Sequence, residues 1–303
     1  MNIRLTVLCE NSVVRPNGTI GEHGFACFIE TAHGNLLFDT GNGSGILRNS
    51  EILGRSLASV KAIVLSHGHF DHTGGLADVL GKTGPVDIVS HPGIFAERYW
   101  VGEHEKRPIG IPFTRKQLEA LGARLQLQQV YGEVAPGIHF SGEIPRVTPF
   151  ETGDPHLMAV DGYGALVPDP FPDDASLVIE TIKGLVVLLG CAHAGMVNTL
   201  NLVREKTGCE HLYAVLGGTH LAPASDEQFA GTVRVLRAFG VERIGVSHCT
   251  GQPRAAQLHA EFGGRFFFAS VGSMLEVSSS KAWRFRTRPD CRRLLCPSPP
   301  RKC

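Results

Sequence analysis

Residues 66–75 read Ser-His-Gly-His-Phe-Asp-His-Thr-Gly-Gly and place three imidazoles and one carboxylate within six consecutive positions. Each buried imidazole needs hydrogen-bond partners and a buried carboxylate needs more, so a packed core gains nothing from this pattern. Neutral imidazole and carboxylate are ligands for zinc and similar divalent ions. The stretch therefore predicts a metal-binding loop, and a solvated His-rich turn is the alternative.

The spacing within this loop indicates more than one ion. His67 and His69 are two residues apart, so they point the same way in an extended loop. Asp71 and His72 are adjacent and can face a second point. The four side chains are therefore candidate ligands for two neighbouring metal positions.

The flanking residues put the loop between a strand and a helix. Residues 60–65 form a short apolar, β-branched run that is typical of a buried strand, and residues 76–80 read as the start of a helix. The carboxyl ends of strands are where open α/β sheets build their sites. Gly74 and Gly75 allow the backbone to come close to an ion.

Composition is that of a soluble enzyme. The chain has 303 residues, 29 basic and 29 acidic, which gives no overall positive charge for nucleic-acid binding. We find no apolar run of transmembrane length and no signal-peptide pattern, so we expect a cytoplasmic protein that does not bind membranes. The eight cysteines are dispersed without a CxxC pair, so we expect most of them to be reduced.

Two similar halves follow one another along the chain, each with a hairpin, further strands and a helix. This pattern predicts an α/β protein of stacked sheets covered by helices. The expected strands are 4–9, 24–31, 35–39, 62–66, 86–90, 176–181, 185–189, 211–216, 243–247, 265–269 and 273–277, and the expected helices are 76–80, 196–207 and 225–239.

The loop motif resembles the His-x-His-x-Asp-His signature of the metallo-β-lactamase-fold hydrolases, and the resemblance covers residues 1–278. Two flanking segments extend it: Asp39 in 35–41 resembles an Asp that supports the metal loop, and His248 in 245–251 resembles the last metal-binding His. The resemblance implies a four-layer αββα sandwich. It also implies a divalent-metal cofactor, which we expect to be two zinc ions, with manganese or iron as alternatives.

The chain departs from that family's pattern at two ligand positions. Cys191 follows the strand 185–189, where the superfamily often has an Asp that bridges two metals. The usual His before the hairpin at 176–181 is missing, and we expect His193 to replace it. Cys191 is a candidate bridge or ligand, or a buried thiol, and Asp174 is a candidate ligand or a turn cap.

Three further residues are candidates for contact with a substrate. His220 follows a predicted strand and two glycines, which favours a general acid or a substrate contact over a metal ligand. His23 precedes a strand and is expected at the same opening. Arg146 is a natural contact for a phosphate group, because a guanidinium pairs with two phosphate oxygens, and an ion pair with Glu143 or Glu151 is the alternative.

Four motifs narrow the resemblance, namely residues 22–26, 142–146, 190–193 and 247–251. Together they are similar to metal-dependent hydrolases related to the dihydropterin ribofuranosylaminobenzene phosphate synthase. The predicted function is hydrolysis of a phosphoester, cyclic phosphate or other ester-like small molecule by a hydroxide that the ions generate from water, oriented by Asp71. A synthase-type enzyme of pterin chemistry and a non-enzymatic metal or ligand sensor are the alternatives.

Two segments interrupt this pattern. Residues 91–172 are rich in proline and aromatic residues and are expected to be an irregular insertion, either a substrate lid or a surface excursion. Residues 279–303 are basic and contain prolines, and we expect a disordered tail. A nucleic-acid or membrane arm is the alternative for that tail.

Overall fold

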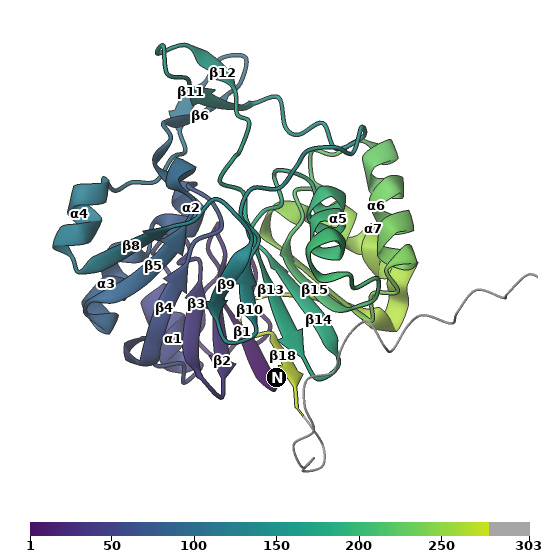
Figure 1. The fold of residues 1–303 in the computed structure, drawn as a ribbon, viewed down its shortest axis with the longest axis horizontal. Helices are drawn as coiled ribbons and strands as arrows, with labels where there is room; N and C mark the ends of the chain where they lie inside the picture. Colours follow the sequence, from purple (N-terminus) through teal and green to yellow (C-terminus); the bar gives the residue numbers. More distant parts are fainter. Residues whose placement is uncertain (279–303) are drawn as a thin grey trace, which may run out of the picture.

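Two seven-stranded sheets pack face to face, and helices cover the outer face of each (Figure 1). The computed structural model describes residues 1–278. Each sheet buries one face against the other sheet and one face under helices, which is why its central strands read as continuous apolar runs. The predicted four-layer αββα sandwich is therefore confirmed.

The first sheet carries the N-terminal half of the protein. Strands β18, β1, β2 and β3 pair antiparallel, whereas β3, β4, β5 and β8 run parallel to one another. Its strands, in spatial order, are β18 (Met274–Val277), β1 (Ile3–Cys9), β2 (Ala26–Thr31), β3 (Gly34–Phe38), β4 (Val60–Val64), β5 (Val86–Ser90) and β8 (Ala123–Leu127).

The second sheet repeats this arrangement with the C-terminal half. Its strands β14, β15, β16 and β17 run parallel, while β13, β10 and β9 pair antiparallel at the other side. Its strands, in spatial order, are β17 (Phe266–Phe268), β16 (Arg243–Ser247), β15 (Leu212–Gly218), β14 (Gly184–Leu189), β13 (Ser176–Thr181), β10 (Ile138–Phe140) and β9 (Gly132–Ala135).

Strand β14 illustrates how the sequence divides between the two faces of a sheet. Val186 and Leu188 belong to the core between the sheets, and the alternate residues Leu185, Val187 and Leu189 pack under the helices. Side chains alternate across a strand, so five successive apolar residues serve both layers. The helices are α1 (Ile46–Ile52), α2 (Phe70–Thr73), α3 (Leu76–Thr83), α4 (Arg115–Ala120), α5 (Met196–Thr207), α6 (Asp226–Ala238) and α7 (Gln252–Phe262).

Most predicted elements agree with the structure to within two residues, and four helices were missed, namely α1, α2, α4 and α7. Helix α4 begins with a capping box between Thr114 and Gln117, a signal that is present in the sequence. Helix α7 follows Gly251 and has a proline in its first turn, which is also a recognisable start. Helix α1 has no side-chain cap and no such signal.

The expected irregular insertion at 91–172 is only partly correct. Three of its strands, β8, β9 and β10, complete the edges of the two main sheets, so these parts belong to the sandwich. Four other strands of this segment form a third sheet that stands above the sandwich at the top of Figure 1. Its strands, in spatial order, are β12 (Leu166–Pro168), β11 (Leu157–Val160), β6 (Arg98–Val101) and β7 (Lys106–Pro108).

Within residues 1–278, none of the helices has the length and apolar character needed to cross a membrane. The predicted basic tail at 279–303 lies outside the described residues.

Candidate metal centre

The buried carboxylate of Asp39, directly after β3, holds the start of the His-rich loop. Its Oδ1 accepts the Ser66 N–H at 2.7 Å, and its Oδ2 accepts the Ser66 hydroxyl and His72 Nδ1, each at 2.7 Å. Because the Ser66 hydroxyl donates to Asp39, its oxygen accepts from His67 Nδ1, 2.8 Å away. Asp39 therefore orients His72 directly and His67 through Ser66, so that in each ring Nε2 is the nitrogen turned away from these hydrogen bonds.

Three imidazole nitrogens converge on one point. His67 Nε2 lies 3.1 Å from His69 Nδ1 and 3.3 Å from His193 Nε2. Burial and the neighbouring imidazoles lower the pKa of all three histidines well below the ordinary value, so all three are neutral. His193, from the loop after β14, thus stands beside the two histidines with which it was predicted to act.

The spacing of these nitrogens fits a divalent ion. An ion with tetrahedral bonds of about 2.0–2.1 Å to nitrogen separates its ligands by about 3.3 Å. Each neutral imidazole has one N–H, and hydrogen bonds among these three rings leave the opposite nitrogens, His69 Nε2 and His193 Nδ1, buried without a partner. The donor set therefore fits the divalent ion that the loop motif predicts.

A second group of candidate ligands surrounds Asp71. Its Oδ2 lies 3.0 Å from His248 Nε2, 3.2 Å from His23 Nε2 and 4.0 Å from His72 Nε2. Burial opposes ionisation of Asp71, but the imidazoles outweigh this and hold its pKa well below the ordinary value. His248 is oriented by Asn11, whose Oδ1 lies 3.0 Å from Nδ1, so its Nε2 faces Asp71.

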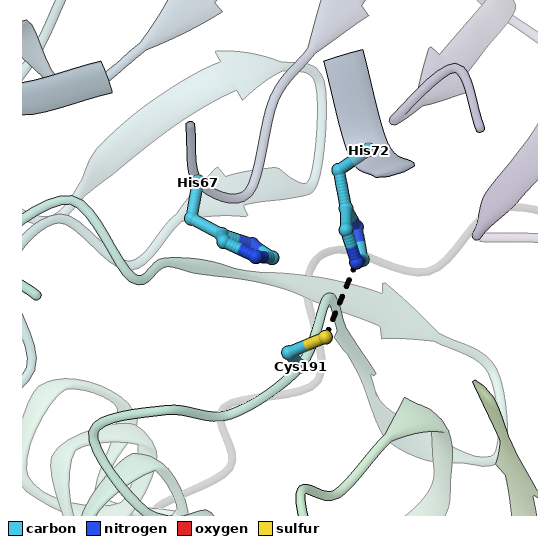
Figure 2. Close-up of side chains that lie close together, drawn as sticks. All are labelled: His67, His72 and Cys191. Carbon is cyan, nitrogen blue, oxygen red and sulfur yellow. Dashed lines mark hydrogen bonds between the residues drawn. The ribbon is translucent and has the colours of Figure 1, made fainter. Parts of the chain in front are cut away.

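Cys191 lies close to His67 of the first group and His72 of the second (Figure 2). Its Sγ is 3.1 Å from His72 Nε2 and within 4.8 Å of candidate ligand atoms of His67, His193 and His248. The thiol is almost completely buried. A sulfur in this position can contact an ion in either group.

Every non-glycine residue with a positive φ in residues 1–278 lies at this edge of the sandwich. The five are Asp39, Phe171, Ala192, His220 and His248, with φ between 47° and 56°. Such conformations cost of order 1–3 kcal/mol each and persist where the surrounding structure enforces them, often at functional sites. Their location supports a functional role for this edge independently of the residue types.

Asp39 and most of the candidate ligands lie directly after parallel strands of the two sheets. Asp39 and the His-rich loop follow the carboxyl ends of β3 and β4, and Cys191, His220 and His248 follow those of β14, β15 and β16. Ends of parallel strands meet at one edge of each sheet, so the face-to-face packing brings the two sets together. The site is therefore shared between the two halves of the chain.

A cavity of 190 Å³ opens above the candidate ligands. The third sheet and the segments beside it supply its opposite wall, with Trp100, Arg107, Ile109, Asp154 and Leu157. On the metal side it is lined by His23, His69, Phe70, Asp71, Cys191, His193, His220, His248 and Cys249. This is a compact site for a small molecule.

His220 lies where the cavity meets the histidine cluster. Its ring centroid is 4.4 Å from that of His193, and its Nε2 is 3.7 Å from Asp154 Oδ2. Burial opposes the charged form, but Asp154 and the sulfur of Cys249 outweigh this effect and raise the pKa of His220 to about 9. The side chain can therefore present a proton to the cavity.

Sequence reasoning missed the network that fixes the loop from behind. Arg98, which is fully buried, donates to both carboxylate oxygens of Asp173 and, at 2.6 Å, to Asp169. Asp173 in turn accepts the N–H of Gly68, between His67 and His69, at 2.8 Å. Arg98 on the third sheet therefore holds, through Asp173, the backbone between His67 and His69.

Two other predicted residues do not line the cavity. Arg146 is exposed, its guanidinium lies beside Gly153, and it does not line the cavity, so its contact with a substrate stays a prediction. Asp174 is buried, and its Oδ2 accepts the N–H of Ala194 at 2.8 Å. It therefore supports the loop that carries His193, and none of the clusters of candidate metal ligands in residues 1–278 includes it.

The family model of the metallo-beta-lactamase superfamily matches residues 20–195. The chain belongs to this superfamily, whose fold implies binding of divalent metal ions.

Three relatives illustrate the range of similarity. A synthase of Methanocaldococcus jannaschii, 7,8-dihydropterin-6-methyl-4-(beta-D-ribofuranosyl)-aminobenzene-5'-phosphate synthase, is 31% identical over 285 residues, which are 91% of this chain and 97% of the synthase. The crystal structure of Tm1679, a metal-dependent hydrolase of the beta-lactamase superfamily, matches with a TM-score of 0.77 and 29% identity over 91% of this chain and 100% of that one. Zinc-bound PqqB from Methylobacterium extorquens shares the fold, with a TM-score of 0.55 and 14% identity over 91% of this chain and 100% of PqqB.

Replacing Arg98 with methionine leaves the carboxylates of Asp169 and Asp173 buried without their partner. We expect the free energy of unfolding to fall by about 3–5 kcal/mol, as measured by urea denaturation. Arg124→Met is the matched control, because Arg124 pairs with Asp87 on the exposed surface and should change stability by less than about 1 kcal/mol. Equal losses in the two variants would contradict the proposed importance of the buried network.

Titration of the buried carboxyl group of Asp174 is expected to make the stability of the metal-free protein depend on pH. Burial raises the pKa of Asp174 from its ordinary value to about 7, although the Ala194 N–H opposes this. Between about pH 4 and pH 7 the folded protein therefore keeps a proton that the unfolded chain releases, so this contribution to stability falls as pH rises. Asp174→Asn should remove a slope of about 1 kcal/mol per pH unit, and an unchanged slope in urea denaturation would contradict the assignment.

Proposed function

We propose that the protein is a metal-dependent hydrolase of an ester-like small molecule, with phosphoesters and cyclic phosphates as the first candidates. The observation that carries this proposal is the convergence of two groups of candidate ligands below one cavity. Membership of the metallo-beta-lactamase superfamily and the likeness to Tm1679 support the same class.

We propose two metal positions. The first would be held by His67, His69 and His193, and the second by Asp71, His72 and His248, with Cys191 between them as a shared ligand. Zinc suits this combination of nitrogen, oxygen and sulfur donors, while manganese, which favours oxygen ligands, suits it less well. When bound, such ions supply Lewis acidity and a water molecule of lowered pKa.

The protein's own residues would orient the reaction. Asp71 is held by His23 and His248, so its carboxylate has a fixed position at the edge of the cavity. His220 would donate a proton to the leaving group, and Asp154 would hold the imidazole in its charged form. His23, which is exposed at the opening, would contact the substrate.

A synthase-type enzyme on the same metal site is the second candidate. The observation that favours it is the 31% identity to the Methanocaldococcus jannaschii synthase across nearly the whole chain. A non-enzymatic metal or ligand sensor is the candidate of another class. Turnover of any ester substrate by the metal-loaded protein would exclude a sensor that lacks enzymatic activity.

His67→Ala tests the first metal position. We expect loss of at least one bound ion by elemental mass spectrometry, and at least about a hundredfold loss of activity against a panel of phosphodiesters and lactones. His33→Ala is the control, because His33 is exposed in the turn between β2 and β3. Full metal content together with full activity in His67→Ala would show that the proposed site is wrong.

Cys191→Ser tests the shared sulfur ligand. In cobalt-substituted protein a metal–thiolate bond gives a charge-transfer band in the near ultraviolet, and we expect Cys191→Ser to remove most of this band and to reduce metal stoichiometry or affinity. Cys209→Ser is the matched control, because that thiol donates to the His211 carbonyl oxygen outside the candidate metal clusters of residues 1–278. An unchanged band and an unchanged metal content would exclude Cys191 as a ligand.

A further inference from the structure

One row of side chains crosses the third sheet and faces the candidate metal centre. Leu157 on β11 is the direct partner of Trp100 on β6, and Trp100 is the direct partner of Arg107 on β7. Residues paired in this way project from the same face of a sheet. All three line the 190 Å³ cavity, so this face of the sheet is its wall.

The alternate residues point away from the cavity. Tyr99, the neighbour of Trp100, pairs with Met158 and Pro108 and carries Lys106 over its ring at 3.8 Å. None of these four residues lines the cavity. The register of the third sheet thus selects Leu157, Trp100 and Arg107 for the inner face.

Two attachments fix this row relative to the candidate ligands. His69 and Gly110 form a β-bridge, and the N–H of Phe70 donates to the carbonyl oxygen of Ile109 at 3.0 Å. Arg98, two residues before Trp100, binds Asp173 behind the His-rich loop. The wall is therefore tied to the metal side at both ends.

Arg107 has the capacity to bind an anion. It is the one lysine or arginine that lines the cavity within residues 1–278. Its guanidinium lies over the Trp100 ring at 5.0 Å, which holds it in place, and its nearest carboxylate is that of Glu105 at 3.9 Å. Both members of that pair are more than half exposed, so the pair contributes little and a ligand can displace it.

We propose that the row Leu157–Trp100–Arg107 is the specificity wall of the site and selects substrates with a planar apolar body and a second, distal anionic group. The reacting ester would lie over the candidate ligands, the planar body against Leu157 and Trp100, and the distal carboxylate or phosphate on Arg107. A guanidinium fork suits either anion. This proposal rests on the proposed function, and it assigns to Arg107 the anion contact that the sequence had suggested for Arg146.

The test uses two phosphonates that differ by one carboxylate and are not hydrolysed. We would measure the dissociation constants of phenylphosphonate and 4-carboxyphenylphosphonate for the metal-loaded protein by calorimetry. We expect the carboxylated compound to bind at least about tenfold more tightly, as one charge-assisted contact allows. Arg107→Gln should abolish this ratio while the affinity for phenylphosphonate and the metal content stay unchanged.

Arg124→Gln, on the exposed surface of β8, is the control and should keep the ratio. A ratio near one in the wild type, or a ratio retained in Arg107→Gln, would overturn the specificity wall. Binding is measured here without turnover, so the result is separate from the hydrolase assignment. If the protein hydrolyses no ester but keeps the Arg107-dependent ratio, the proposed function fails and the wall stands.

Discussion

The carboxylate of Asp39 is withdrawn completely from solvent and is satisfied by three donors from the loop after β4. An ionised carboxylate in such a place is very costly unless its hydrogen bonds are complete, so the loop can adopt few other arrangements. Two of those bonds continue through Ser66 and His72 to the imidazoles of the His-rich loop. The orientation of His67 and His72 in the candidate centre depends on these hydrogen bonds.

The loops after the strands of the second sheet carry the remaining residues of the centre, and their backbone is strained. Ala192, His220 and His248 have positive φ on three neighbouring loops, and Cys191 and His193 flank the first of them. A site divided in this way forms only when the two halves of the chain have packed together. The stability of the inter-sheet core therefore supports the positive-φ loops, whose conformations an isolated half has no reason to adopt.

Local patterns explain how much could be predicted from the sequence. The His-rich loop, Asp39, His193 and His248 each follow an apolar strand, so their position at one edge of the sandwich could be expected before the structure. Cys191 was predicted as a bridge or ligand, or a buried thiol, and its position beside His72 and close to His193 and His248 required the structure. The strands β8, β9 and β10 were not predicted. They lie in a proline-rich segment, and short strands at a sheet edge carry little periodic signal.

Residues that act through tertiary contacts could not be predicted. Arg98 lies in the segment that the sequence predicted to be irregular, and only the fold shows that it is buried between two carboxylates. Trp100 and Arg107 become part of the site through the register of a small sheet, which the sequence does not specify. Arg146 was the more obvious anion contact by motif, but the cavity is lined by Arg107.

We propose that Cys191 joins two adjacent metal positions beside the loop that Asp39 supports. Anomalous diffraction from a crystal of the zinc-loaded protein tests this most directly. We predict two peaks about 3.5–4 Å apart, one beside His67, His69 and His193 and the other beside Asp71 and His248, with the sulfur of Cys191 within bonding distance of at least one. A single peak, or two peaks that both lie away from Cys191, would contradict a two-metal site with Cys191 as a ligand.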